Sequence, residues 1–285
     1  MNYVITGSSS SIGLKLIKTI SLNKKNFIYA LYLKNKPCIY KKNIKYIKHE
    51  LSKSTKKINL TADVLIHCAT VVPQNTTKRN DFMSANFIGP KYLVERLLEN
   101  NLKYIIFLSS MSVYEKNSKV IDENSTLTKD NYYAESKILF EKKLREISKK
   151  NNIKILILRL PGYLGKNSKY NFLSKVKKNI LKKEPVFFQN PNAYFNNLIH
   201  EKTICSIIKK FINFDKRKFL ILNLASKYPM KIINIIKLMY KLANKKENYI
   251  IDDIKTNSFI ISTKFIIKCG YKINTTKEEI LNFMK

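Results

Sequence analysis

The stretch Val4-Ile-Thr-Gly-Ser-Ser-Ser-Ser-Ile-Gly13 decides how the chain begins. A short apolar run, Tyr3–Thr6, leads into a turn bracketed by two glycines, and apolar residues then recur at helical spacing. The first glycine permits a tight turn out of a strand, and the second permits a helix to pack closely on a sheet. Such a unit holds a pyrophosphate at the helix N-terminus, where N–H groups and the helix dipole attract anions. The predicted contacts are Gly7, Ser10, Ser11, Ile12 and Gly13, with a serine hydroxyl in place of the middle glycine of the usual loop.

Strand and helix patterns alternate through the first half of the chain. Strands are predicted at Phe27–Leu33, Val64–His67, Tyr104–Leu108 and Ile153–Leu158, and helices at Asn86–Leu98 and Tyr132–Ser148. This alternation predicts an α/β fold, a Rossmann-type doubly wound parallel sheet, over residues 1–165. Residues 166–285 are predicted to form mostly a smaller substrate-binding lobe, with segments near 195–225 packing back on the first domain. Its elements are predicted at Lys166–Lys183, Leu220–Leu224, Lys231–Leu242 and Thr276–Met284.

The formal charge of +34 raises the question of a nucleic-acid partner. Only five of the 54 basic residues are arginine, the residue that specific nucleic-acid readers favour, and the lysines are scattered over the whole chain. Lys, Asn and Ile share AT-rich codons, so compositional drift explains the charge more simply. No apolar run approaches the ~20 residues of a membrane-spanning helix. The four cysteines form no CxxC pair, so no metal site is expected, and the chain is predicted to be cytoplasmic.

Two further segments carry candidate chemistry. Tyr133 and Lys137 are four residues apart in a predicted helix and therefore share one face. A lysine ammonium one turn away favours the phenolate and is expected to lower the tyrosine pKa from about 10. Ser110 follows a predicted buried strand, at the edge where open α/β sheets bind ligands, and its hydroxyl can bond a carbonyl or hydroxyl undergoing redox.

Together these segments closely resemble the extended short-chain dehydrogenase/reductase family, in its sugar-nucleotide epimerase/dehydratase group. Ser109-Ser-Met-Ser-Val-Tyr114 resembles the family's SSxxVYG segment, and Tyr133 with Lys137 matches its YxxxK pair. The resemblance runs almost end to end, and all six glycines fall on family positions. Further matching segments are Thr6–Gly13 (the phosphate loop), Glu50-Leu51 (the adenine contact), His67–Thr70, Asn86–Gly89, Arg159–Gly165 (beside the nicotinamide), Asn197–His200 and Lys268–Tyr271.

The resemblance implies a nucleotide-sugar substrate and hydride transfer at its C4, with Ser110, Tyr133 and Lys137 as the catalytic residues. Tyr133 would pass the proton, Lys137 would tune it and hold the cofactor ribose, and Ser110 would orient the sugar oxygen. A homodimer through the helices Asn86–Leu98 and Tyr132–Ser148 is the family expectation. The implied cofactor contacts, beyond the opening loop, are Lys34, Glu50, Leu51, Ala69, Asn86, Lys137 and Pro161.

The reaction is narrowed by departures from the family pattern. Family dehydratases carry an Asp-Glu pair where Met111 and Ser112 stand, so dehydration is disfavoured. No acidic residue ends the second strand, and Lys34 there favours NADP over NAD. A 4-keto sugar-nucleotide reductase is therefore the first prediction, and an NAD-dependent 4-epimerase is the alternative. A non-catalytic dinucleotide- or RNA-binding relative is the alternative of another class. Asn196 replaces an arginine that in the family can bind a substrate phosphate.

Overall fold

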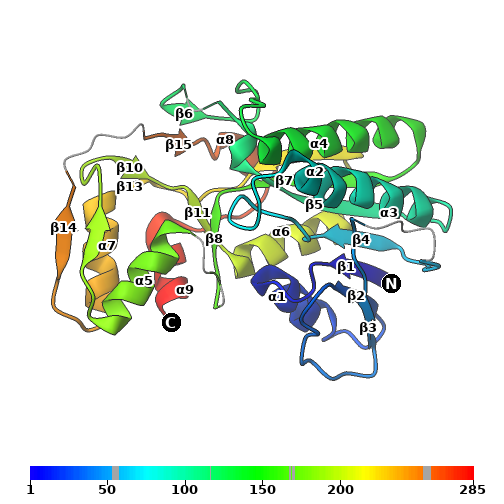
Figure 1. Ribbon diagram of the computed structural model, residues 1–285, viewed down its shortest axis with the longest axis horizontal. Coiled ribbons are helices and arrows are strands. Elements are labelled where there is room, and N and C mark those ends of the chain that lie inside the picture. The colour runs from blue at the N-terminus through cyan, green and yellow to red at the C-terminus, as the bar shows by residue number, and fades with distance from the viewer. Residues whose placement is uncertain (53–57, 116, 167, 169–170, 253–257) are drawn as a thin grey trace. The chain divides into compact units, whose positions relative to one another are not determined.

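The computed structural model describes residues 1–52, 58–115, 117–166, 168, 171–252 and 258–285 (Figure 1). The chain forms two compact units. The first comprises Met1–Tyr114, Thr126–Arg159 and Ile208–Leu222, and the second comprises Glu115–Ser125, Leu160–Ile207 and Asn223–Lys285. In the part of the chain that the structure describes, no helix is long and apolar enough to cross a membrane.

A central sheet organises the first unit, and it confirms the predicted α/β fold class. Among the described residues it has seven strands in the order β12-β7-β5-β4-β1-β2-β3, and the pairings from β5 to β3 are all parallel. The strand order reverses beside β1, because the chain builds outward first to β2 and β3 and then, on the other side, to β4 and β5. Open α/β sheets bind ligands at such a reversal. The strands are β1 (Asn2–Thr6), β2 (Phe27–Tyr32), β3 (Ile44–Lys48), β4 (Val64–His67), β5 (Tyr104–Ser110), β7 (Lys154–Leu160) and β12 (Phe219–Asn223).

Helices cover both faces of this sheet, with α3 and α4 on one side and α1 on the other (Figure 1). The starts of α1 and α4 are fixed by side-chain caps: Ser10 accepts from the Gly13 N–H, and Asn131 accepts from the Ala134 N–H. The helices are α1 (Ser11–Ile20), α2 (Arg79–Met83), a π-helical turn η2 (Ser84–Ile88), α3 (Gly89–Leu98), the 3₁₀ turn η3 (Met111–Val113) and α4 (Tyr132–Lys150).

The core beneath α3 and α4 is built from alternate residues of the strands. Phe107 of β5 and Phe140 of α4 meet edge to face at a centroid distance of 4.8 Å. Successive strand residues point to opposite faces, so a strand covered on both sides is apolar throughout, as the run Ile155–Leu158 is. The same cluster includes Val4, Leu65, Leu93, Val94, Leu97, Ile105, Leu144, Ile147, Ile155 and Ile157.

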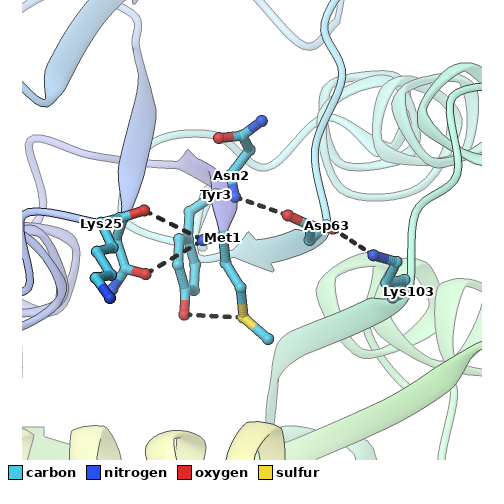
Figure 2. Close-up of polar contacts among 7 residues, drawn as sticks. Met1, Asn2, Tyr3, Lys25, Asp63 and Lys103 are labelled. Atoms are coloured by element: carbon cyan, nitrogen blue, oxygen red, sulfur yellow. Dashed lines mark hydrogen bonds and ion pairs between the residues drawn. The ribbon is translucent and has the colours of Figure 1, made fainter.

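Asp63 ties three strands together at the amino ends of the sheet (Figure 2). Its carboxylate accepts from the backbone N–H of Asn2 at 2.9 Å and pairs with Lys103 Nζ at 2.8 Å. Its backbone carbonyl also accepts from the N–H groups of Lys103 and Tyr104. The strands β1, β4 and β5 are thereby held in register at the edge opposite their carboxyl ends.

The second unit consists of short paired strands and helices. Its strand pairs are β8 (Gly162–Leu164) with β11 (Leu198–His200), β9 (Val186–Phe188) with β14 (Tyr249–Ile251), β10 (Tyr194–Phe195) with β13 (Met230–Lys231), and β6 (Val120–Ile121) with β15 (Ile260–Ile261). Its helices are α5 (Phe172–Lys182), α7 (Ile232–Leu242), α8 (Lys264–Lys268) and α9 (Thr276–Met284). The helix α6 (Glu201–Phe214) begins in the second unit and ends in the first.

Three features of the fold differ from the sequence-based expectations. The strand β3 was not anticipated, because its pattern Ile-Lys-Tyr-Ile-Lys is masked by the abundance of lysine. The helix α6 was also missed. The predicted helix Asn86–Leu98 corresponds to the end of η2 together with α3. The helical segment starts earlier, with α2 at Arg79, where no side-chain cap marks its start in the sequence. Part of the basic segment Lys166–Lys183 lies outside the described residues, and α5 occupies its remainder from Phe172.

Candidate active site

The opening loop joins β1 to α1 in the conformation that its glycines allow. Gly7 has a φ of +63°, and a Cβ added to it would lie 2.7 Å from the backbone nitrogen of Ala69. A Cβ on Gly13 would lie 2.3 Å from the carbonyl oxygen of Gly7. The loop therefore lies against the end of β4 and under the first turn of α1, and neither position has room for a side chain.

The serines of the loop divide into different roles. Ser10 donates its hydroxyl proton to the Gly7 carbonyl at 2.7 Å and accepts from the Gly13 N–H at 3.1 Å, so its side chain holds the loop together. The predicted donation from this hydroxyl to a phosphate would require those bonds to open. The Ser8 hydroxyl is buried and has no hydrogen-bond partner among the described residues. Ser11 and Ile12 form the first turn of α1 and offer backbone N–H groups to an anion.

Thr6 and His67 join the loop to the end of β4. The Thr6 hydroxyl oxygen accepts from the N–H groups of Cys68 and Ala69 at 3.2 and 3.1 Å, and it lies 2.8 Å from His67 Nδ1. Its single proton must therefore go to Nδ1, which places the proton of the neutral ring on Nε2. Burial, aided by the charge of Lys137, lowers the pKa of His67 to about 3, so the ring is neutral at pH 7. His67 therefore links β4 to the opening loop through Thr6.

The remaining expected contacts for an adenosine group follow β2 and β3. Lys34 is exposed just beyond β2. Glu50 is half-buried beyond β3 and accepts from the Ser52 hydroxyl at 2.8 Å. Leu51 packs against the core cluster. Because both strands run parallel to β1, these residues share one edge of the sheet with the opening loop.

Tyr133 and Ser110 meet at the same edge. Ser110 ends β5, where its hydroxyl accepts from the Ser112 N–H at 3.1 Å and hydrogen-bonds with the Tyr133 hydroxyl. Tyr133 lies in the first turn of α4, and its ring packs edge to face on Phe82 at 6.1 Å. The neighbouring Ser109 instead donates to Glu141 at 2.5 Å. The structure therefore brings Ser110 to Tyr133 and turns Ser109 into the interior.

Lys137 lies one turn after Tyr133 and is 1% exposed. Its Nζ donates to the Leu108 carbonyl at 3.1 Å and lies 4.8 Å above the Phe107 ring, a cation–π distance. Burial lowers the pKa of Lys137 to about 7, against the opposing effect of the Glu141 carboxylate. This side chain can therefore exchange a proton near neutral pH.

A buried ion pair lies beneath these groups. Glu141 is one further turn along α4 and pairs with Arg159 of β7 at 2.6 Å, with both side chains at most 5% exposed. Arg159 also donates to the Tyr114 hydroxyl, 2.5 Å away, and Ser109 donates to Glu141. Every partner of the pair is polar and hydrogen-bonded, which is the condition under which a buried charge pair is tolerated.

The expectation that Lys137 lowers the Tyr133 pKa is wrong for this structure. Burial raises the pKa of Tyr133, while the hydrogen bonds from Ser110 and Thr70 oppose the rise. The Lys137 ammonium does not offset it, because Nζ is directed to the Leu108 carbonyl and lies 5.7 Å from the centre of the Tyr133 ring. The two hydroxyl groups, rather than the lysine, are the donors that a phenolate would find here.

Asn86 and Thr70 complete the surroundings of Tyr133. Asn86 is fully buried, and protein groups fill both ends of its amide: the oxygen accepts from the Val71 N–H and the Thr70 hydroxyl, and the nitrogen donates to the Val71 carbonyl and to Ser136. A cofactor contact by this side chain would require that network to open, so we assign Asn86 a supporting role. Thr70 was missed in the sequence. The parallel register pairs His67, the last residue of β4, with Phe107 of β5; Thr70 lies three residues beyond His67, and Ser110 lies three residues beyond Phe107.

One expected cofactor contact, Pro161, and one departure from the family pattern, Asn196, belong to the second unit. Pro161 directly follows β7. Asn196, which replaces a family arginine, is buried and links the loop at Ser226 to the strand β15: its amide nitrogen donates to the carbonyls of Ser226 and Ile261, and its oxygen accepts from the Ile261 N–H. The Asn196 side chain therefore stabilises the fold of the second unit.

The residues of the first unit fit a nicotinamide dinucleotide. The loop from Gly7 to Gly13 excludes side chains, and the first turn of the ten-residue helix α1 follows it. Ser110 and Tyr133 supply a hydroxyl pair that can bond a substrate oxygen, and Lys137 supplies a titratable amine one turn away. Such a group can donate or accept a proton at a carbon–oxygen centre undergoing redox.

Comparison with known proteins gives a consistent result. Residues 3–213 match the family model described as the NAD dependent epimerase/dehydratase family. The UDP-glucose 4-epimerase of Lactobacillus helveticus is 30% identical over 109 residues, 37% of this chain and 33% of that protein, so this match spans a third of its length. The D-erythronate dehydrogenase of Haemophilus influenzae is 24% identical over 237 residues, 73% of this chain and 74% of that protein. The structure of a UDP-glucuronic acid 4-epimerase from Bacillus cereus with NAD superposes at a TM-score of 0.81, with 17% identity over 100% of this chain and 95% of that chain.

Proposed function

This chain belongs to the NAD-dependent epimerase/dehydratase family, and from that premise we propose that it is an NAD-dependent 4-epimerase of a UDP-activated sugar. The observation that carries the proposal is the hydrogen bond between Ser110 and Tyr133 at the carboxyl end of β5, with Lys137 one turn farther along α4. The relatives named as UDP-sugar 4-epimerases supply the choice of substrate and reaction.

In this proposal, the loop Gly7–Gly13 and the first turn of α1 hold the cofactor pyrophosphate. The bound nicotinamide supplies a carbon that can accept and return hydride. Tyr133 must first release its own phenolic proton; as the phenolate it takes the proton of the C4 hydroxyl when the sugar is oxidised, and it returns that proton when the 4-keto sugar is reduced. Ser110 donates to the same oxygen and orients it. Lys137, buried beside the phenol, holds or releases its own proton near pH 7.

A 4-keto sugar-nucleotide reductase that uses NADP is the second candidate. Lys34 is exposed beyond β2, and no acidic residue stands there to bind a 2′-hydroxyl. A reductase consumes its reduced cofactor, whereas an epimerase regenerates it in each turnover. Dehydration remains disfavoured, because Met111 and Ser112 provide no carboxylate beside Ser110.

The test is a product assay on the purified protein. UDP-galactose with added NAD should convert to UDP-glucose without net change in cofactor absorbance, and Tyr133→Phe should abolish the conversion. Tyr132→Phe is the matched control, because that neighbouring ring is 47% exposed. Consumption of NADPH with a 4-keto sugar nucleotide would instead support the reductase. No turnover and no rise in melting temperature with NAD, NADH, NADP or NADPH would refute both, and salt-sensitive RNA binding would then favour the non-catalytic alternative.

A further inference from the structure

Thr70 lies three residues beyond the end of β4, and Ser110 is the last residue of β5. Both side chains hydrogen-bond with the Tyr133 hydroxyl. Thr70 is exposed, whereas Asn86 on its other side is fully buried. The threonine therefore connects the Tyr133 phenol to the buried Asn86 amide.

The proton count limits what Thr70 can do. Its hydroxyl oxygen lies 3.2 Å from Asn86 Oδ1 and 3.3 Å from the Val71 carbonyl oxygen, and both are acceptors. A hydroxyl has one proton, so while Thr70 donates to either acceptor it can only accept from the Tyr133 phenol. When the phenol becomes a phenolate, the proton of Thr70 must turn to the charged oxygen. Asn86 Oδ1 keeps a donor in that state, since the Val71 N–H is 2.8 Å away.

The same asparagine also fixes the backbone of Tyr133. Asn86 Nδ2 donates to the Ser136 hydroxyl at 3.3 Å, and Ser136 donates to the Tyr133 carbonyl at 2.8 Å. A closed circuit therefore runs from the phenol through Thr70, Asn86 and Ser136 back to the residue that carries the phenol. The circuit passes through the π-helical turn η2, which places Asn86 between α2 and α3.

We propose that Thr70 is a positioning residue of the acid–base site, whose hydroxyl turns from Asn86 to the Tyr133 oxygen when the phenol loses its proton. The inference rests on the proposed function for its role in turnover. Ser110 is expected to engage the substrate oxygen, so Thr70 is the donor that stays on the phenolate. Without it, the phenolate would lose a donor in a half-buried position, and its formation would become less favourable.

The direct test follows the ionisation of Tyr133 without requiring turnover. A fluorinated tyrosine placed at position 133 reports its own titration by fluorine NMR, separate from the other 16 tyrosines, since the chain has 17. Thr70→Val keeps the shape and removes the hydroxyl, and it should shift that titration to higher pH. Thr70→Ser should restore it. Thr19→Val is the control, since the Thr19 hydroxyl bonds the Lys15 carbonyl within α1.

The kinetic arm uses unlabelled protein and UDP-galactose. Thr70→Val should lower kcat about fivefold, the size of one neutral hydrogen bond, with KM nearly unchanged and the basic limb of the kcat profile moved up in pH. A titration shift without turnover in the wild-type protein would sustain the role of Thr70 and refute the proposed reaction. An unshifted titration in Thr70→Val, checked in Thr70→Ala, would overturn the role of Thr70 whatever the activity.

Discussion

Replacing Glu141 by glutamine should destabilise the protein strongly, because it removes the charge that compensates Arg159. Both side chains are at most 5% exposed, and the guanidinium contacts the carboxylate through Nε at 3.2 Å and Nη2 at 2.6 Å. Breaking a buried pair by removing one partner costs about 3–5 kcal/mol, since the other charge stays buried. Glutamine keeps the shape and one acceptor oxygen, so we expect the lower end, about 3 kcal/mol. A chain of this size loses about 2–4 °C per kcal/mol, which gives a fall of roughly 6–12 °C in melting temperature.

The assay is thermal and urea denaturation followed by circular dichroism, with Glu146→Gln as the matched control. Glu146 lies on the same helix but is 64% exposed and only 4.0 Å from Lys143, a surface pair that contributes little. The double variant Glu141→Leu with Arg159→Met removes both charges and should recover most of the loss. A Glu141→Gln protein that melts within about 2 °C of Glu146→Gln would refute the reasoning, because the buried charge would then have found solvent or another partner.

Three further perturbations follow from the same structure. The hydrogen bond from Lys103, and after it the Asn2 N–H, hold the pKa of Asp63 below its ordinary value, so the carboxylate contributes stability above the unfolded pKa of about 3.9 that is lost as the pH falls (Figure 2). Asp63→Asn should remove this contribution. Urea unfolding should therefore show a difference in stability between wild type and variant that is larger at pH 6 than at pH 3. Between about pH 7 and 9 the unfolded protein keeps a proton on Lys137 that the folded protein has lost, so the free energy of unfolding should rise by up to about 1.4 kcal/mol per pH unit. Lys137→Met should remove this rise. Equal slopes in both proteins would contradict the pKa shift of Lys137. Gly13→Ala should cost about 1–3 kcal/mol by overpacking and abolish the thermal shift with NAD, because its Cβ would meet the Gly7 carbonyl at 2.3 Å, whereas Ser9→Ala in the exposed part of the loop should change neither.

Six strands of the Rossmann-type sheet were predictable, because apolar runs and glycines are local signals; they are β1, β2, β4, β5, β7 and β12. The strand predicted at Val64–His67 has the bounds of β4. The start of α2 was not predictable, since Lys78 offers no side-chain cap and the π-helical turn has no sequence signature. The strand β3 was not predicted for a different reason. In a chain with so many lysines, a lysine at alternate positions does not stand out as the exposed face of a strand.

The candidate site shows the same division between local and non-local signals. Ser110, Tyr133 and Lys137 could be named because each follows a strand or shares a helix face within a few residues. Thr70 could not be named from the sequence, because its position beside Tyr133 depends on the register in which β4 pairs with β5. The direction of the Tyr133 pKa was also beyond the sequence, since the spacing to Lys137 says nothing about the Leu108 carbonyl that takes its Nζ.

The consecutive residues Ser109 and Ser110 explain how one strand end serves both the interior and the site. Alternation along β5 sends Ser109 to the buried pair of Glu141 and Arg159, and it sends Ser110 to the Tyr133 phenol. Burial lowers the pKa of Lys137 to about 7, and the Glu141 carboxylate one turn away acts to raise it. Burial of the lysine therefore has the largest effect on its pKa, and the charges of Glu141 and Cys68 act against it. We therefore expect replacement of Glu141 to change the Lys137 pKa more than replacement of a surface lysine does.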